Sequence, residues 1–389
     1  MPEPMAPADT DQQTSATRPT DAAPGDPAGH PTGHPSGDPT GLGSRHQSLL
    51  MVTGPGRSGT SAVTGALNQL GIHVPPVLVK ANRSNNRGFF ETRWVVDFQR
   101  KVLEKAHTYE FDADPRAIER MAKADSQRNR EQLTTWLRSA VRGHQQVVIK
   151  DPRSVWLDNL WVGAADTIGL TISYLTMLRH PAEVVGSRRT YYASTDDERK
   201  ARDYAISKVA GWINVSLINE RQTRGRSRTF LRYTDLLDDW RTALSGVRER
   251  LGLEFNDPLE PGTPSPIDDF ISPELHRIRT GWDDLGVPEP LRELADEVWA
   301  ACERLADDGE SAELAAAFDA LSRRYEQLYR DAAAITIDTT ASAVSRATAR
   351  VTRSLQQEWA KDSAESPAIG RAVDLGRRAA RRVRRRIKN

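Results

Sequence analysis

Short apolar runs alternate with longer amphipathic stretches through the middle of the chain. Four runs have the length and composition of buried parallel strands, at residues 49–52, 147–149, 172–178 and 229–231. Helical periodicity occupies residues 61–70, 92–105, 115–142, 182–192, 196–220 and 235–251. This alternation predicts an α/β fold with a doubly wound parallel sheet, which binds ligands at the carboxyl ends of its strands.

The two ends of the chain differ from this middle part. Residues 1–46 are rich in proline and glycine and contain almost no large apolar side chain, so we expect a disordered tail. After residue 287 the pattern is helical, over 288–307, 312–335 and 341–361. The predicted organisation is a tail (1–46), an α/β domain (47–285), a helical extension (286–362) and a basic tail (363–389).

The basic tail has its own pattern. Apolar or small residues recur every three or four positions at Ile369, Val373, Gly376, Ala380, Val383 and Ile387. Cations surround them at Arg377, Arg378, Arg381, Arg382, Arg384, Arg385, Arg386 and Lys388. A basic amphipathic helix of this kind fits an anionic membrane surface. The alternatives are a solvated charged tail and an end that adheres to nucleic acid.

Composition narrows the class of protein. The 389 residues carry a net charge of only +1, which argues against nucleic-acid binding by the overall field. A single cysteine, Cys302, excludes a disulfide framework and a cysteine-based metal site. No apolar run is long enough to span a membrane, and no secretory signal precedes the domain. We expect a cytoplasmic protein, with peripheral contact at the inner membrane face as the role of the basic tail.

The first predicted strand leads into a glycine-rich turn, Gly54-Pro55-Gly56-Arg57-Ser58-Gly59-Thr60-Ser61. Such a turn points backbone N–H groups at an anion and adds the positive end of a helix dipole. It differs from the nucleoside triphosphate loop, Gly-x4-Gly-Lys-Ser/Thr, because Thr60 occupies the position of the lysine. The sequence therefore predicts a nucleotide site of another kind.

The segment from Arg57 to Ser61 resembles the (Lys/Arg)-Ser-Gly-Thr-(Ser/Thr) loop of sulfotransferases that use 3′-phosphoadenosine-5′-phosphosulfate (PAPS). A second segment carries the same resemblance: Arg179 ends a predicted strand, and Ser187 follows eight residues later after a proline. In that family, such a pair binds the 3′-phosphate. A guanidinium group is a forked, permanently charged donor to phosphate oxygens.

The resemblance, which covers about residues 48–280, implies in-line transfer of a sulfuryl group from PAPS to an acceptor, without a metal. It implies that Gly56, Arg57, Ser58, Gly59, Thr60 and Ser61 hold the 5′-phosphosulfate. Arg57 and Lys150, the latter at the end of the second predicted strand, would stabilise charge on the reacting groups. Tyr233, at the end of the fourth strand, would lie near the nucleotide.

The general base is expected to be Glu91. Small-molecule sulfotransferases carry a histidine two residues after the strand-end lysine, but Pro152 stands there in this chain. Carbohydrate-acting members use a glutamate about thirty residues after the loop, and Glu91 fits that place. Asp151 and His73 are reserve candidates, and His107 is a weaker one.

Several further contacts are expected from the same resemblance. Arg277 and Arg279 are candidates near the 3′-phosphate or the acceptor. The acceptor pocket is expected to draw on Arg153, Phe89, Phe90, Trp156 and Trp161. Aromatic faces suit sugars, but they suit a protein core equally well.

The acceptor implied by a glutamate base is a hydroxyl of a small molecule, a sugar or a glycolipid. Partner molecules are therefore expected to be this acceptor, a membrane surface touched by the basic tail and a second copy of the chain, with no nucleic acid. Two other functions are compatible with parts of the sequence. A small-molecule kinase would share the strand–loop–helix but needs a lysine at position 60, and a membrane-associated scaffold would use the nucleotide fold without catalysis.

Overall fold

The four predicted strands form one parallel sheet. The computed structural model describes residues 47–365 apart from 83, 194 and 277. The strands β1 (Ser48–Thr53), β2 (Gln146–Lys150), β3 (Thr171–Leu178) and β4 (Arg228–Arg232) lie in the order β2-β1-β3-β4. The expectations for residues 1–46 and 366–389, and for Arg277, lie outside the described residues.

The register brings the carboxyl ends of the strands to one edge. Val52 of β1 pairs with Lys150, the last residue of β2, and with Leu175 of β3. Leu178, at the end of β3, pairs with Arg232, at the end of β4. The segments that follow these four strands therefore begin beside one another.

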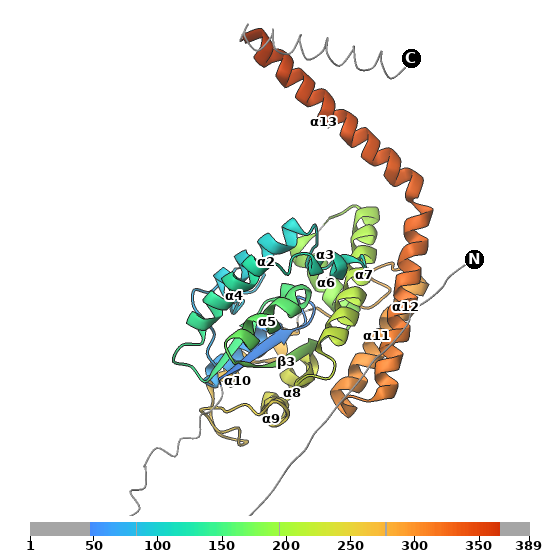
Figure 1. The fold of residues 1–389 in the computed structure, drawn as a ribbon. Helices are drawn as coiled ribbons and strands as arrows, with labels where there is room; N and C mark the ends of the chain where they lie inside the picture. The colour runs from blue at the N-terminus through green and yellow to red at the C-terminus, as the bar shows by residue number, and fades with distance from the viewer. Residues whose placement is uncertain (1–46, 83, 194, 277, 366–389) are drawn as a thin grey trace, which may run out of the picture. The chain divides into compact units, whose positions relative to one another are not determined.

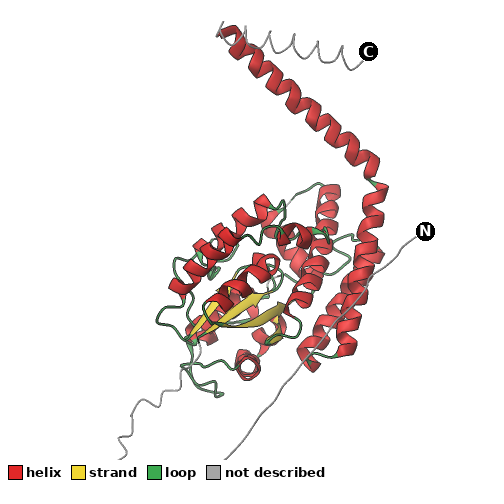
Figure 2. Ribbon diagram, viewed as in Figure 1, coloured by secondary structure: helices red, strands yellow, loops and turns green. Residues whose placement is uncertain are grey.

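Helices cover both faces of the sheet, as Figures 1 and 2 show. The helices between and after the strands are α1 (Thr60–Gln69), α2 (Arg93–Lys105), α3 (Ala117–Ala122), α4 (Gln127–Ala140), α5 (Asp158–Thr167), α6 (Pro181–Tyr192), α7 (Glu198–Thr223), α8 (Tyr233–Asp238), α9 (Trp240–Leu251) and α10 (Pro266–Phe270). Two short 3₁₀ helices are η1 (Pro152–Leu157) and η2 (Pro273–Leu275). The predicted α/β class with a doubly wound parallel sheet is confirmed.

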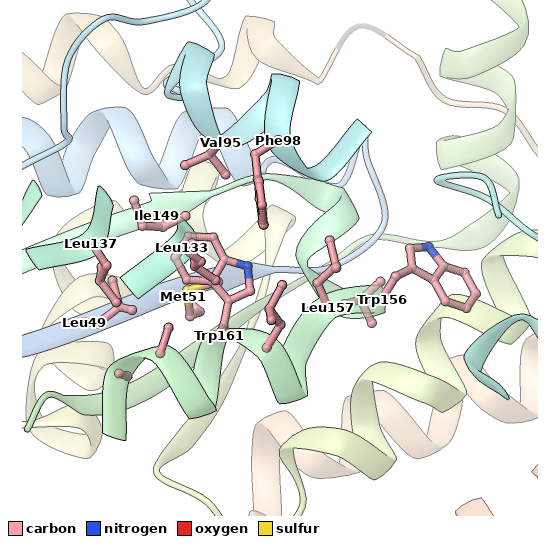
Figure 3. Close-up of a cluster of buried hydrophobic side chains, with 14 of the residues drawn as sticks. Leu49, Met51, Val95, Phe98, Leu133, Leu137, Ile149, Trp156, Leu157 and Trp161 are labelled. Carbon is pink, nitrogen blue, oxygen red and sulfur yellow. The ribbon is translucent and has the colours of Figure 1, made fainter. Parts of the chain in front are cut away.

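Alternate residues of the central strand point into different cores. Leu49 and Met51 pack with side chains of α2, α4 and α5, and Figure 3 shows this cluster around Trp161. Leu50 and Val52 pack on the other face with side chains of α1, α8 and α9. Burial on both faces explains why the strands have continuous apolar sequences instead of alternating ones.

The helices differ from the sequence expectation in several places. The region 115–142, predicted as one helix, contains α3 and α4, because Ser126 caps a new helix by accepting a hydrogen bond from the backbone N–H of Asn129. The region 235–251 is divided in the same way by Asp239, which caps α9. Helix α5 was missed: it is short, contains Gly163 and is buried along much of its length, so its amphipathic signal is weak.

The C-terminal region is helical, as expected. Its helices are α11 (Glu289–Asp308), α12 (Ala312–Ile335) and α13 (Ile337–Glu365). Leu294 of α11 and Phe318 of α12 join Trp212 of α7 in one buried cluster. Residues 337–361 of α13 are exposed. Within the described residues, no helix has the length and apolar character needed to cross a membrane.

Candidate functional site

The glycine-rich turn connects β1 directly to α1. Gly59 is the residue before the helix and has φ +89°, in the left-handed region that favours glycine. A Cβ atom at this position would overlap the ring of Tyr233. Arg57 also has positive φ, at 81°, which is uncommon for a residue with a side chain. The tight backbone exposes the first amides of α1, where an anion is stabilised.

A cavity of about 430 Å³ opens over this turn, at the carboxyl ends of the strands. Most of the sequence-predicted residues line it: Gly56, Arg57, Gly59, Thr60, Ser61, Glu91, Lys150, Arg179, Ser187 and Tyr233. Among the residues expected to hold the nucleotide or to act in catalysis, Ser58 is the exception, since its side chain is fully buried. Its hydroxyl oxygen has no hydrogen-bond partner, so the loop retains one unsatisfied polar group.

Arg57 joins the glycine-rich turn to α6. Its Nε donates a hydrogen bond to Oγ of Ser187 at 3.0 Å, although the two residues are 130 positions apart. Its Nη1 donates to the carbonyl of Ser84 at 3.2 Å, and the guanidinium lies 4.6 Å from the centre of the Tyr191 ring. The two motifs that carry the family resemblance therefore meet in one cavity.

Arg179 is held from several directions. Its Nη1 donates to the carbonyl of Arg57 at 3.2 Å, and its Nη2 donates to the carbonyl of Ile278 at 2.9 Å. Its Nε donates to Glu183 one helical turn away, at 2.9 Å. The guanidinium lies 5.0 Å from the centre of the Tyr233 ring. This side chain is only 8% exposed, so its charge is fixed in place beside the turn.

Lys150 and Glu91 form the closest ion pair of the cavity. Nζ of Lys150 lies 2.6 Å from Oε1 of Glu91, and it also donates to Oγ of Ser61 at 3.2 Å. The side chain of Lys150 is 3% exposed and that of Glu91 is 13% exposed. The strand end of β2 thus places a cation and a carboxylate in contact at the floor of the cavity.

A second charged group contains Arg153, which was expected at the acceptor pocket, together with Glu110 and Arg188, which sequence reasoning missed. Oε1 of Glu110 accepts a hydrogen bond from Nη1 of Arg188 at 2.8 Å, and Arg153 lies 4.0 Å away. All three residues line the cavity. Burial acts to raise the pKa of Glu110, but Arg188 and Arg153 outweigh it and hold the pKa below its usual value. Glu110 lies in a loop with no motif, so only its tertiary neighbours identify it.

Asp151, a reserve candidate for the base, is fully buried behind the cavity. Its Oδ1 accepts hydrogen bonds from the backbone N–H and from Nη1 of Arg153, at 2.9 and 2.8 Å. Its Oδ2 has no partner. Burial raises the pKa of Asp151 to about 6; Arg153 opposes this shift and Glu91 adds to it. Its position favours a structural role in orienting Arg153.

The two histidines named as candidates for the base, His73 and His107, do not line the cavity. His73 lies beside the amino-terminal half of β2, bridged to Val147, and stacks on His144 with ring centres 3.4 Å apart. His107 follows the end of α2 and does not line the cavity.

Several aromatic expectations also change. Trp156 and Trp161 belong to the core, at 2% and 0% exposure, so the suggestion that they line an acceptor pocket is wrong. Phe89 does line the cavity, whereas Phe90 packs edge-on against Phe270. Further aromatic side chains at the cavity come from the end of α6, where Tyr191 and Tyr192 are found. The sequence could have indicated them, because they lie on the same predicted helix as Ser187, one turn further along.

Arg279 is described by the structure but does not line the cavity. The same late segment contributes Leu275 and Ile278 to the lining, and Tyr233 donates a hydrogen bond from its hydroxyl to the carbonyl of Leu275 at 3.1 Å. This segment thus closes the cavity beside Arg179.

Comparison with known proteins gives likenesses of fold. No protein-family model and no curated protein matches the chain. Among solved structures, the sulfotransferase domain of the Synechococcus PCC 7002 olefin synthase is similar at 16% identity and a TM-score of 0.37, covering 65% of this chain and 93% of that one. The sulfotransferase domain from the curacin biosynthetic pathway is similar at 14% identity and a TM-score of 0.37, covering 67% and 99%.

Proposed function

We propose that this protein is a sulfotransferase that transfers a sulfuryl group from PAPS to an acceptor hydroxyl. The contact of Lys150 with both Ser61 and Glu91 carries this proposal. In a nucleoside triphosphate loop, the residue equivalent to Ser61 gives its hydroxyl to Mg²⁺. Here the Ser61 hydroxyl accepts a hydrogen bond from the Lys150 ammonium group, and the Glu91 carboxylate contacts the same ammonium group. A fixed cation and a base at one point suit transfer of a sulfuryl group to a hydroxyl.

The nucleotide would lie across the turn. The backbone amides from Ser58 to Ser61 and the Arg57 guanidinium suit the 5′-phosphosulfate. Arg179 and Ser187 suit the 3′-phosphate, since both face the same cavity from β3 and α6.

The reaction then follows from the positions of the charged groups. The acceptor O–H gives its proton to the Glu91 carboxylate as the acceptor oxygen forms a bond to sulfur. The bond between sulfur and the bridging oxygen of the 5′-phosphate breaks, and that oxygen keeps the electron pair. Arg57 and the loop amides stabilise the charge on the leaving phosphate, and Lys150 stabilises the sulfuryl oxygens. The products are a sulfate ester and adenosine 3′,5′-bisphosphate.

We further propose that the acceptor belongs to the carbohydrate or glycolipid class and that the reaction takes place in the cytoplasm. Position 152, where small-molecule sulfotransferases have a histidine base, is a proline in this chain, so Glu91 would act as the base. Tyr191 and Tyr192 bring aromatic faces to the cavity, and such faces pack well on sugar rings.

Calorimetric titration tests the nucleotide part of this proposal. The purified protein is titrated with adenosine 3′,5′-bisphosphate, with adenosine 5′-monophosphate and ATP–magnesium as controls. Binding that requires the 3′-phosphate is the expected result, and labelled PAPS with a panel of carbohydrates and glycolipids then tests the acceptor class. Binding of ATP–magnesium without binding of the bisphosphate would favour a kinase, and no binding of either would favour a non-catalytic module.

A further inference from the structure

Helix α13 carries a line of apolar side chains that no described residue covers. Ile337 is 65% exposed, Val344 and Val351 are 59% exposed, Leu355 is 52% exposed and Trp359 is 65% exposed. Single exposed apolar residues are ordinary on protein surfaces, but a row of them along one helix marks an interaction surface. We call the residues from Ile337 to Leu355 on this side the α13 stripe.

The spacing of the stripe is that of a coiled coil. Ile337, Val344 and Val351 recur at intervals of seven. Ala341, Thr348 and Leu355 recur at the same interval and fall four residues after the first set. Intervals that alternate between four and three place both sets on one side of a helix and form the seam of a heptad repeat. Such a seam packs against the corresponding seam of a second helix.

The charges of α13 favour a helix over a bilayer as the covering partner. Arg346, Arg350 and Arg353 lie on the side of the helix opposite the stripe, because each residue advances by about 100°. The sequence of α13 balances its basic residues with acidic ones, which are Asp338, Glu358, Asp362 and Glu365 against Arg346, Arg350, Arg353 and Lys361. Helices that lie on anionic membranes carry an excess of cations instead. Over its whole length α13 has no net charge, although residues 337–355, which contain the stripe, carry three arginines against Asp338, so two full helices have no net repulsion.

We propose that a second copy of this chain covers the α13 stripe, so that the protein self-associates through α13. Seam positions pair Ile, Val and Leu with smaller Ala and Thr residues, which lets two helices approach closely. Thr348 puts one polar group in the middle of the seam, where it limits the registers that two helices can adopt. This inference does not depend on the proposed function, because no residue of α13 lines the cavity.

Sedimentation equilibrium of the full chain over a series of concentrations tests the proposal. The test variant carries Val344→Asp and Val351→Asp, which put two charges into the seam. The control carries Ser342→Asp and Ala349→Asp, which add the same charges at the same spacing on the outer side of the helix. We expect an assembly of two or more chains for the unaltered protein and the control, and association at least about 100-fold weaker for the seam variant.

The other results would overturn the proposal. A chain that stays monomeric at every concentration has no partner copy on α13, and an assembly that the seam variant leaves intact forms through another surface. If the chain is monomeric, sediments with phosphatidylserine vesicles and loses that binding in the seam variant, then the stripe binds a membrane instead of a second copy. Equal far-ultraviolet circular dichroism of both variants confirms that a loss of association is not a loss of helix.

Discussion

The two sides of the cavity are built from different kinds of charge. On the side of β3 and α6, Arg57 and Arg179 donate to backbone carbonyls and to a serine hydroxyl, and Arg179 also donates to Glu183, so guanidinium groups with a fixed charge are held in place. On the side of β2, Lys150 and Glu91 share one close contact, and Asp151 lies buried behind them. Burial raises the pKa of Asp151 to about 6, whereas a guanidinium group keeps its charge at every working pH.

This difference assigns separate tasks to the two sides. The arginine side suits recognition of an anion, because its charge persists at every working pH. The β2 side suits proton transfer, because the Glu91 carboxylate lies there in contact with Lys150. Substitutions on the two sides should therefore separate binding from turnover, and the predictions below test that separation in order of decreasing effect.

The largest effect is expected from Glu91→Gln. The substitution keeps the shape of the side chain but removes the proton acceptor, so sulfuryl transfer from PAPS should fall by about 10²- to 10⁴-fold. The rate is measured as release of bisphosphate from labelled PAPS with the best acceptor of the panel. Affinity for adenosine 3′,5′-bisphosphate should change less than about threefold, since Glu91 belongs to the side that does not bind it.

Glu110→Gln serves as the matched control, because Glu110 is the other carboxylate that lines the cavity. A collapse of the rate in this variant, with Glu91→Gln fully active, would transfer the base to Glu110. If both variants transfer sulfuryl groups at the wild-type rate, neither carboxylate takes the proton, and the β2 side does not have the proposed catalytic task.

The next effect concerns the arginine side. Arg179→Ala should weaken binding of adenosine 3′,5′-bisphosphate by about 100-fold, because hydrogen bonds between charged groups contribute about 1.5–3 kcal/mol each. Calorimetry measures this change. Arg189→Ala is the control: Arg189 lies on the same helix as Ser187 and donates to the carbonyl of Asp284, outside the cavity lining. Unchanged affinity in Arg179→Ala would mean that the 3′-phosphate lies elsewhere.

The turn between the two sides is probed by Gly59→Ala. Ala is strained at φ +89°, and its Cβ would overlap the ring of Tyr233. Together these costs should lower the free energy of unfolding by about 2–4 kcal/mol. Urea denaturation measures the loss, and bisphosphate binding should fall with it.

Gly143→Ala separates the two causes. Gly143 has φ +81°, but nothing lies within 4 Å of a Cβ there, so this variant carries the backbone strain alone. Its loss should be about 1 kcal/mol. If both variants lose the same free energy of unfolding, the overlap with the Tyr233 ring adds nothing to the backbone strain, and the ring must move aside easily.

The smallest effect is a pH dependence on the β2 side. The pKa of Asp151 is raised from 3.8 to about 6, so the folded protein binds more protons than the unfolded chain between these values. Stability from this group is therefore lost as pH rises from about 4 to about 6, and the cost is full above that range. Asp151→Asn removes the titration, so its stability relative to wild type should increase over that interval. A difference that is constant with pH would contradict the raised pKa.

Local patterns in the sequence were enough for the sheet and the nucleotide turn. The four apolar runs became four strands, since continuous Val, Ile and Leu segments are stable only when both faces are buried. The turn before α1 was readable because its glycines and its place after a strand are local features. The same locality explains the errors: the caps of Ser126 and Asp239 were overlooked, and the amphipathic pattern of α5 is weak.

The sequence by itself determined that Arg57, Lys150, Arg179 and Tyr233 would lie at strand ends, because position along a strand is a local property. Only the tertiary structure decided which of these groups touch. The contacts of Arg57 with Ser187 and of Lys150 with Glu91 join segments 130 and 59 positions apart, and Glu110 entered the cavity from a loop with no motif. Such contacts depend on how the strands are ordered and on which helix covers which face, and no short stretch of chain encodes that arrangement.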